Sequence, residues 1–285
     1  MAGNIAVITD SIANLPPDMI AQYRMEIVPI MLLIGGKLYR DGVDITPTEA
    51  YKLFLKDPSR FNTSPSSPGH YLAAYREASK RAKEVFCITL SSKISTGYQM
   101  ALVAKDQARR ELPGIHIEVM DSQNVTASEG FIALAAARAA EAGKSLAEVI
   151  KSAEEVKEKV TFIAFLDTLR HVYRTGRIPK VASQIGAMLN VRPLLTVSNG
   201  AIRFKGVVKS REQGMSRLIR ILRDKVGKGP VHVAVMHAFA PEEAEILKKR
   251  VSSEFVCTEL FITELSPVMG YATGTGTLGL AFYKD

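Results

Sequence analysis

A row of hydroxyl-bearing residues between an apolar run and a helical pattern is the part of this chain best suited to chemistry. Residues 85–99 read VFCITLSSKISTGYQ, and the apolar start is long enough for one buried strand. The hydroxyls that follow belong to Ser91, Ser92, Ser95 and Thr96, and Gly97 opens the helical pattern. Amides in a helix's first turn are unpaired and attract carboxylates or phosphates. The segment therefore predicts one end of an anion site, with an ordinary helix cap as the alternative.

A second hydroxyl-rich stretch is NTSPSSP, at residues 62–68. Pro65 and Pro68 hold this stretch extended, and its hydroxyls begin with Thr63 and Ser64. We expect no regular helix or strand here. The stretch is a second candidate source of hydroxyl donors.

Nucleophilic catalysis is one possible use of these hydroxyls. Ser92 lies outside any GxSxG sequence, and a catalytic triad would need a histidine beside it. His171 and His237 are the remaining candidates, and neither has a supporting acid nearby in sequence. We therefore expect a binding protein and not an enzyme. The alternative is a serine-dependent esterase that acts on an acyl substrate.

Metal chemistry has no support in the sequence. There is no HExxH, no cysteine pair and no DxDxDG loop. Cys87 and Cys257 both lie in apolar runs, as expected of free thiols in a reducing cytoplasm. The first residues, MAGNIAVITDS, read as a strand rather than a signal peptide, and no apolar run reaches the ~20 residues that span a bilayer. We expect a cytoplasmic protein with no metal site and no cofactor.

A carboxylate bound by neutral hydroxyls needs a further source of affinity, and a long apolar tail supplies it. Burying ~14 methylenes at ~0.8 kcal/mol each gives roughly 11 kcal/mol before costs, whereas each hydrogen bond nets only ~1–2 kcal/mol. Ordering the ligand takes back part of this gain. The predicted ligand is therefore a carboxylate with a long apolar tail, held in a tunnel at a domain junction.

The pattern of elements predicts two α/β domains. Strands alternate with helices through residue 159, which indicates βαβ units and a mainly parallel sheet flanked by helices. Ligands collect at the carboxyl ends of such strands, where Asp10-Ser11, Ser91-Ser92 and Asp121-Ser122 fall. We place the boundary at residue 159, giving an amino-terminal domain of residues 1–159 with the carboxylate-binding loops and a carboxyl-terminal domain of residues 160–285.

Several predicted elements bear on the site. We expect one strand at residues 27–33 with a hairpin return to 37–39, and a helix capped by Thr126 and Glu129. We also expect a basic connector at 170–180, a helix at 181–189 and a hairpin that turns at Asn199-Gly200. The final stretch, residues 267–285, is glycine-rich, ends in a strand and could return to the ligand site through close backbone approach.

The net charge of +8 suggests an acidic or phosphorylated partner. Arg217, Arg220 and Arg223 recur every three residues on a predicted helix, and Lys205, Lys209 and Arg211 precede it. A solvated helix face is the simpler interpretation, and docking of an acidic partner is the functional one. A basic surface alone is a weak indication of nucleic-acid binding, which we do not expect. We expect no stable membrane insertion, and transient membrane contact stays open.

Five motifs, in order along nearly the whole chain, resemble those of the DegV family. Residues 8–16 read ITDSIANLP, 62–68 match the family's TSxPS and 90–99 match its SSxxSGTY. Residues 173–180 correspond to its GGR[IV] connector, and 267–276 to its final glycine motif.

The resemblance implies that this chain binds a single fatty acid, and that Thr63 and Ser92 hold the carboxylate. The neighbouring motif positions implied for the same site are Ser64, Ser95, Gly97, Thr273, Gly274 and Thr275. Some family members are the fatty-acid-binding subunit of fatty acid kinase, whose catalytic protein makes an acyl phosphate for phospholipid synthesis. The residues we expect to face such a partner are Arg177, Lys205, Arg211 and Arg220.

Three departures from the family pattern concern the head group. SGTY reads Ser95-Thr96-Gly97-Tyr98 here, and the first glycine of GGR[IV] is Thr175. Where most members read H-x-G-P-G, this chain has residues 272–276 as ATGTG, so Ala272 replaces the histidine. Whether this changes the head group stays open, as do lipid chain length and unsaturation, oligomeric state and the partner's identity.

Overall fold

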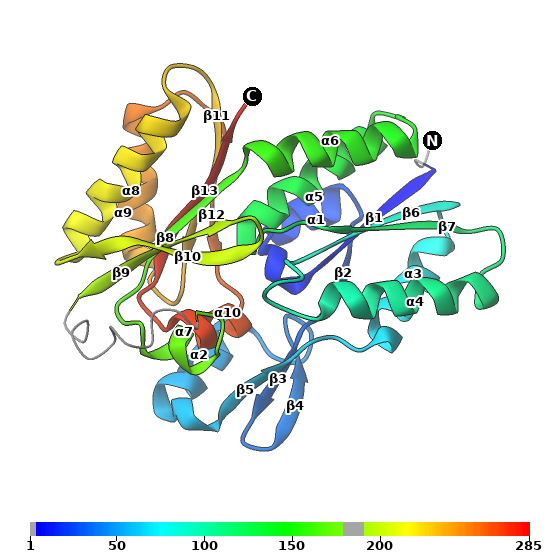
Figure 1. The fold of residues 1–285 in the computed structure, drawn as a ribbon, viewed down its shortest axis with the longest axis horizontal. Coiled ribbons are helices and arrows are strands. Elements are labelled where there is room, and N and C mark those ends of the chain that lie inside the picture. The colour runs from blue at the N-terminus through cyan, green and yellow to red at the C-terminus, as the bar shows by residue number, and fades with distance from the viewer. Residues whose placement is uncertain (1–3, 179–190) are drawn as a thin grey trace.

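The computed structural model describes residues 4–178 and 191–285, which form three β-sheets with helices around and between them (Figure 1). The first sheet is wholly parallel, in the order β2 (Glu26–Val28), β1 (Ile5–Asp10), β6 (Glu84–Thr89) and β7 (His116–Asp121). This confirms the predicted α/β class with a parallel sheet flanked by helices.

Side-chain alternation along β1 explains how the first sheet is covered. Ala6 and Ile8 pack against α3 (Pro68–Ser79) and α4 (Gly97–Glu111). Ile5 and Val7 face the other way, toward α5 (Thr126–Glu141) and α6 (Leu146–Lys159). All six residues of β1 are buried, as expected of a parallel strand with helices on both faces. The short helices α1 (Pro17–Gln22) and η1 (Ser11–Ala13) follow β1.

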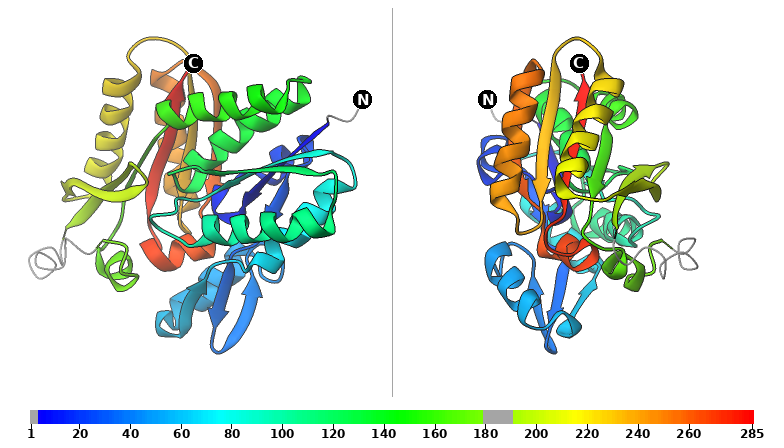
Figure 2. Two further views of the ribbon diagram at one scale, coloured as in Figure 1. Left: turned by 45° about the vertical axis from the view of Figure 1, so that its right-hand side comes forward. Right: turned by 90° about the vertical axis from the view of Figure 1, so that its left-hand side faces the viewer.

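The second sheet has six strands and is mixed. Its order is β10 (Ala201–Val208), β9 (Arg192–Ser198), β8 (Thr161–Phe165), β13 (Leu278–Lys284), β11 (Val231–His237) and β12 (Cys257–Glu264). Only β11 and β12 pair in parallel. Helices α8 (Arg211–Val226) and α9 (Pro241–Glu254) cover one face, as Figure 2 shows, and α5 packs on the other. Alanine-rich α5 therefore lies between the two large sheets.

A small antiparallel sheet completes the fold, in the order β4 (Lys37–Arg40), β3 (Met31–Ile34) and β5 (Phe61–Ser64). Helix α2 (Pro47–Lys56) and η2 (Pro58–Arg60) connect β4 to β5. Figure 1 shows this sheet below the other two, with the short helices α7 (Arg170–Arg174) and α10 (Pro267–Thr273) near it.

The structure corrects several element predictions. The single strand expected at 27–33 is two strands in different sheets, because Pro29 has no amide to continue the ladder. The stretch 62–68 was expected to be irregular, but Phe61–Ser64 pairs with β3 before Pro65 ends the strand. The stretch 170–180, expected to be a connector, begins with a short helix at residues 170–174. The glycine-rich stretch 267–285 begins with another at residues 267–273. The helix predicted at 181–189 lies outside the described residues.

The cap predicted for α5 is also wrong. Val125 is the N-cap residue and makes no side-chain capping bond. Thr126 has a φ of 54°, and its hydroxyl donates to the carbonyl oxygen of Val125. Glu129 is fully buried against β1 instead of reaching back to the cap, because α5 starts inside the protein rather than at its surface.

The carboxyl group of Asp41 joins the three sheets. It follows β4 and accepts a hydrogen bond at 2.5 Å from the Ser266 hydroxyl, just before α10. It also accepts one from Ser11, at the end of β1, whose oxygen accepts the Ile30 amide at 3.1 Å. Nearby, the Tyr51 hydroxyl donates to the carbonyl oxygen of Leu265 at 2.8 Å. These bonds fix α10 against the first and third sheets.

None of the helices in the described ranges is both long and apolar enough to cross a membrane.

His232, on β11, forms a buried ionic cluster at the opposite end of the second sheet. Its ring nitrogens lie 2.9 Å from Glu259 Oε2 and 2.6 Å from Asp285 Oδ1. The ring stacks on Tyr283, with 4.4 Å between centroids. Burial alone would lower the pKa of His232, but the two carboxylates outweigh burial and raise it. Protonated His232 therefore stabilises the fold.

We expect His232→Gln to lower the free energy of unfolding by about 1–2 kcal/mol at pH 6. Because the folded pKa is raised, the stabilisation is complete below the ordinary histidine pKa and is lost as pH rises through the folded value. Urea unfolding at pH 6 and pH 9 should show the penalty shrinking with pH. The exposed His116→Gln is the control and should change stability by under about 0.5 kcal/mol. An equal His232→Gln penalty at both pH values would contradict the assignment.

Candidate ligand-binding site

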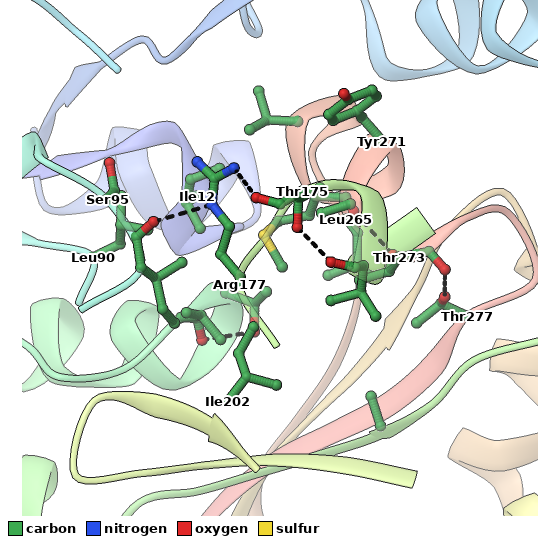
Figure 3. A pocket seen from close by; sticks show the side chains of 18 of the residues that line it. Ile12, Leu90, Ser95, Thr175, Arg177, Ile202, Leu265, Tyr271, Thr273 and Thr277 are labelled. Carbon is green, nitrogen blue, oxygen red and sulfur yellow. Dashed lines mark hydrogen bonds between the residues drawn. The ribbon is translucent and has the colours of Figure 1, made fainter. Parts of the chain in front are cut away.

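A cavity lies where the three sheets meet, and its walls are mainly apolar (Figure 3). The first sheet contributes the loops after β1 and β6, the second sheet contributes β8, β9 and β13, and α10 closes one side. The main apolar side chains of the wall are Ile12, Ile30, Leu90, Ile94, Phe162, Leu166, Leu195, Val197, Ile202, Met236, Val268 and Met269. The arrangement suits an extended hydrocarbon.

Polar side chains on the cavity wall that are available to a ligand include those of Thr63, Ser95 and Arg177, and the Tyr271 hydroxyl also lies on this wall. The Ser95 hydroxyl accepts the Gly97 amide at 3.2 Å, and within the described ranges neither it nor the Thr63 hydroxyl donates a hydrogen bond. The Arg177 guanidinium donates to the carbonyl oxygens of Thr175 at 2.6 Å and Ile94 at 3.4 Å, so it lies beside the residue before Ser95. Two hydroxyl donors and a cation can bind a carboxylate.

The other threonines on the wall are already satisfied. Thr126 donates to the carbonyl oxygen of Val125 at 2.7 Å. Thr273 donates to the carbonyl oxygen of Met269 at 2.9 Å, and Thr277 donates to that of Gly274 at 3.0 Å. With their protons used in these bonds, they can offer a ligand no donated hydrogen bond without first breaking one.

The structure brings some of the expected site residues together and leaves others outside. Thr63, Ser64, Ser95 and Thr273 line the cavity, and so does Ala272. The remaining four, which do not line it, are Ser92, Gly97, Gly274 and Thr275.

Ser92 is held by an acid on the neighbouring strand. Its hydroxyl donates to Asp121 Oδ2 at 2.5 Å, and its amide donates to Oδ1 at 3.1 Å. Its hydroxyl proton is therefore committed to a carboxylate. Ser95, three residues later, lines the cavity instead. The sequence could not show that Ser95 rather than Ser92 lines the cavity, because this depends on the contact between Ser92 and Asp121 on the neighbouring strand.

The glycine-rich tail keeps a backbone path that needs glycine. Gly274 and Gly276 have φ values of 84° and 81°, where side chains are strained. A Cβ on Gly274 would lie 2.7 Å from the ring of His171, and one on Gly276 would meet Asp167. Burial lowers the pKa of His171, and Arg174 and Arg170 lower it further, so it packs as a neutral ring.

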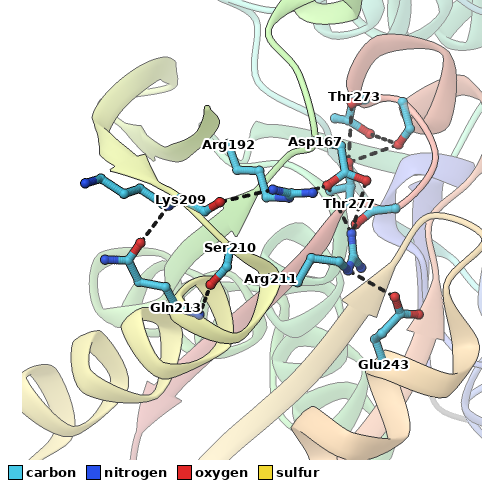
Figure 4. A network of polar contacts seen from close by, with 11 residues as sticks. Asp167, Arg192, Lys209, Ser210, Arg211, Gln213, Glu243, Thr273 and Thr277 are labelled. Carbon is cyan, nitrogen blue, oxygen red and sulfur yellow. Dashed lines mark hydrogen bonds and ion pairs between the residues drawn. The ribbon is translucent and has the colours of Figure 1, made fainter. Parts of the chain in front are cut away.

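Two of the residues expected to face a partner, Arg211 and Arg177, have contacts within the chain, and the other two are exposed. Arg211 donates to Asp167 at 3.1 Å and to the Gly276 carbonyl at 2.9 Å, and it lies 3.0 Å from Glu243 (Figure 4). It therefore holds the glycine turn after α10. Arg177 lines the cavity, as described above. Lys205 and Arg220 are exposed, on β10 and α8 respectively.

Within the described parts of the chain, no group of three or more histidine, cysteine, aspartate or glutamate side chains is placed to hold a metal ion.

Comparison with known proteins agrees with this architecture. The family model described as "Uncharacterised protein, DegV family" matches residues 4–285. The chain belongs to the DegV family. A DegV domain-containing protein of Caldanaerobacter subterraneus is 30% identical over 98% of this chain and 98% of its own length.

Two solved DegV structures share the whole fold. A DegV family protein from Thermus thermophilus, described for its fatty acid binding, has a TM-score of 0.90 at 27% identity, covering 99% of this chain and 100% of its own. DegV from Bacillus subtilis, described as a fatty acid binding protein, has a TM-score of 0.90 at 30% identity with the same coverage. The resemblance seen in the sequence motifs is therefore confirmed.

Proposed function

We propose that this chain binds one long-chain fatty acid in the cavity, with the carboxylate at Thr63, Ser95 and Arg177. The observation that carries the proposal is the pairing of a long apolar wall with two unused hydroxyl donors and a guanidinium. The fatty acid binding described for the two DegV structures above supports it.

The apolar wall supplies most of the affinity in this proposal. Each buried methylene contributes about 0.8 kcal/mol, so a chain of ~14 contributes roughly 11 kcal/mol before the cost of ordering it. A hydrogen bond to a charged group contributes only about 1.5–3 kcal/mol. The head-group residues therefore mainly set which end of the lipid lies at Ser95.

The cavity must widen to hold such a chain. It encloses about 110 Å³. A cavity of about 150 Å³ holds only the six carbons of benzene, so a longer acyl chain needs more room. Met236 and Met269 line the wall, and their unbranched side chains can change rotamer at small cost. These methionines are the side chains we expect to move.

The bound carboxylate would be presented to another protein. Arg177 is exposed, so the polar part of the site lies next to solvent and a partner could reach it. In this proposal the partner is a cytoplasmic kinase that phosphorylates the carboxylate, and the acyl phosphate enters phospholipid synthesis. This chain performs no catalysis in the scheme. Ser92, the candidate nucleophile of an esterase, donates to Asp121 rather than to a histidine.

Native mass spectrometry of freshly purified protein tests the proposal. We expect the mass of one fatty acid on a large fraction of molecules, because a buried apolar tail dissociates slowly. A protein that stays lipid-free after incubation with fatty acids would contradict binding. Turnover of a chromogenic acyl ester that is lost in Ser92→Ala would favour an esterase.

Variants of the head-group residues test the geometry. Thr63→Val and Ser95→Ala should each weaken fatty-acid binding by about 1–3 kcal/mol, because each removes a donor from a partly buried carboxylate. Ser92→Ala is the matched control and should change affinity little. Displacement of a fluorescent fatty acid measures all three. A larger loss of affinity in Ser92→Ala than in Ser95→Ala would indicate that Ser92, and not Ser95, binds the carboxylate.

Ala272→His tests the departure from the family motif. Ala272 lines the cavity, and Gly274 and Gly276 already hold the turn, so the fold should tolerate the ring. We expect affinity to rise by about 0.5–1.5 kcal/mol, more at pH 6 than at pH 8, because a charged imidazole attracts the carboxylate. Ala272→Phe controls for ring volume and should give no such gain. Weaker binding in Ala272→His alone would indicate a different head group.

A further inference from the structure

Two carboxyl groups lie in contact behind the cavity wall, on Asp10 and Glu129. Both side chains have no exposed surface. Thr9 donates its hydroxyl proton to Glu129 Oε1 at 3.1 Å. Within the described ranges, no donor bonds to Glu129 Oε2. The carboxyl groups of Glu129 and Asp10 are close enough to share a hydrogen bond.

No cation in the described ranges neutralises this pair. The titratable groups that face it are Asp41 from the small sheet, Asp121 from β7, Tyr71 from α3 and Cys87 from β6. Burial raises the pKa of Glu129 well above its ordinary range, and Asp10 raises it further. Burial raises the pKa of Asp10 to about 7, against the lowering effect of two amide bonds. Two such carboxyls cannot both be ionised, so the pair holds at least one proton.

Asp10 also holds the wall of the cavity. One carboxyl oxygen accepts the Ile12 amide at 2.9 Å and the other accepts the Leu90 amide at 3.0 Å. Ile12 and Leu90 both line the cavity, and Leu90 begins the loop that carries Ser95. The Tyr71 hydroxyl, buried and without a partner, lies on the other side of this loop beside Gly97. The pair is therefore bonded directly to the backbone of two residues that line the cavity.

We propose that Asp10 and Glu129 form a proton-holding positioning pair for the head-group loop, and that the pair takes up a second proton when a carboxylate binds. The inference rests on the proposed function. The added proton comes from solvent and binds a carboxylate oxygen of Asp10, and no other bond forms or breaks. A ligand carboxylate beside a low-dielectric wall repels the negative charge on Asp10, so protonation relieves the repulsion.

The sign of the pH dependence follows directly. Below pH 7 Asp10 is protonated in the free protein, so binding needs no further proton. Above pH 7 Asp10 is ionised in the free protein, so ligand binding is coupled to uptake of a proton by Asp10. Affinity for a carboxylate should therefore fall by about three- to tenfold between pH 6 and pH 9, as a shift of half to one pKa unit requires. A neutral ligand of the same length should show no such fall.

Isothermal titration calorimetry of dodecanoate and dodecanol tests this, at pH 8 in two buffers of different ionisation enthalpy. Dodecanoate should bind with proton uptake and dodecanol without. Asp10→Asn removes the group that takes the proton and should abolish the uptake. Glu129→Gln keeps a neutral donor beside Asp10, as the protonated acid does, and should keep the uptake. Glu141→Gln, an exposed acid on the same helix, is the matched control and should keep the wild-type uptake.

The outcomes are distinguishable. Dodecanoate binding without proton uptake, or uptake that persists in Asp10→Asn, would overturn the pair and leave the proposed function intact. Equal uptake with dodecanol would overturn it as well. If neither ligand binds, the proposed function itself fails. If a variant unfolds in a thermal scan, the comparison of acid with alcohol on the wild-type protein still decides.

Discussion

The position of the cavity depends on one buried carboxyl, that of Asp41. Its hydrogen bonds with Ser11 and Ser266 join the end of a parallel strand, a small antiparallel sheet and the start of α10. A buried carboxyl without partners is costly, so these two hydroxyls stabilise the fold by bonding to it. The bonds fix the start of α10 against the ends of β1 and β4, and α10 carries Val268, Met269 and Ala272 of the cavity wall.

Helix α5 imposes the second constraint, because it must fit between two sheets. Small side chains allow this, since most of its buried residues are alanine, glycine, serine or threonine. At Gly130 the helix approaches the chain so closely that a Cβ would lie 2.5 Å from the Ala13 carbonyl oxygen. The same close fit places Glu129 against β1, where a helix-capping residue had been expected. One packing requirement therefore explains both the composition of the helix and its buried acid.

The sequence could predict the elements whose signals are local. The alternation of strands and helices, the Asn199-Gly200 turn and the hydroxyl-rich loops all follow from nearby residues. It could not predict that Pro29 divides one apolar run between two sheets, or that β5 pairs with β3, because these depend on contacts distant in sequence. The cavity's polar residues divide in the same way. Thr63 and Ser95 could be recognised from the sequence as hydroxyl donors. That Ser92 bonds to Asp121 instead of lining the cavity, and that Arg177 lies beside Ile94 on the cavity wall, depends on contacts distant in sequence.

Strand β13 lies in the middle of the second sheet although it is the last strand along the chain. It pairs with β8 on one side and β11 on the other, and Gly279 on this strand lines the cavity. A ribosome releases these residues after every other strand has emerged. The sheet cannot close before β13 has been made, and a chain cut short before Leu278 leaves β8 and β11 with unpaired edges. The cavity wall is therefore complete only in chains whose translation has passed this strand.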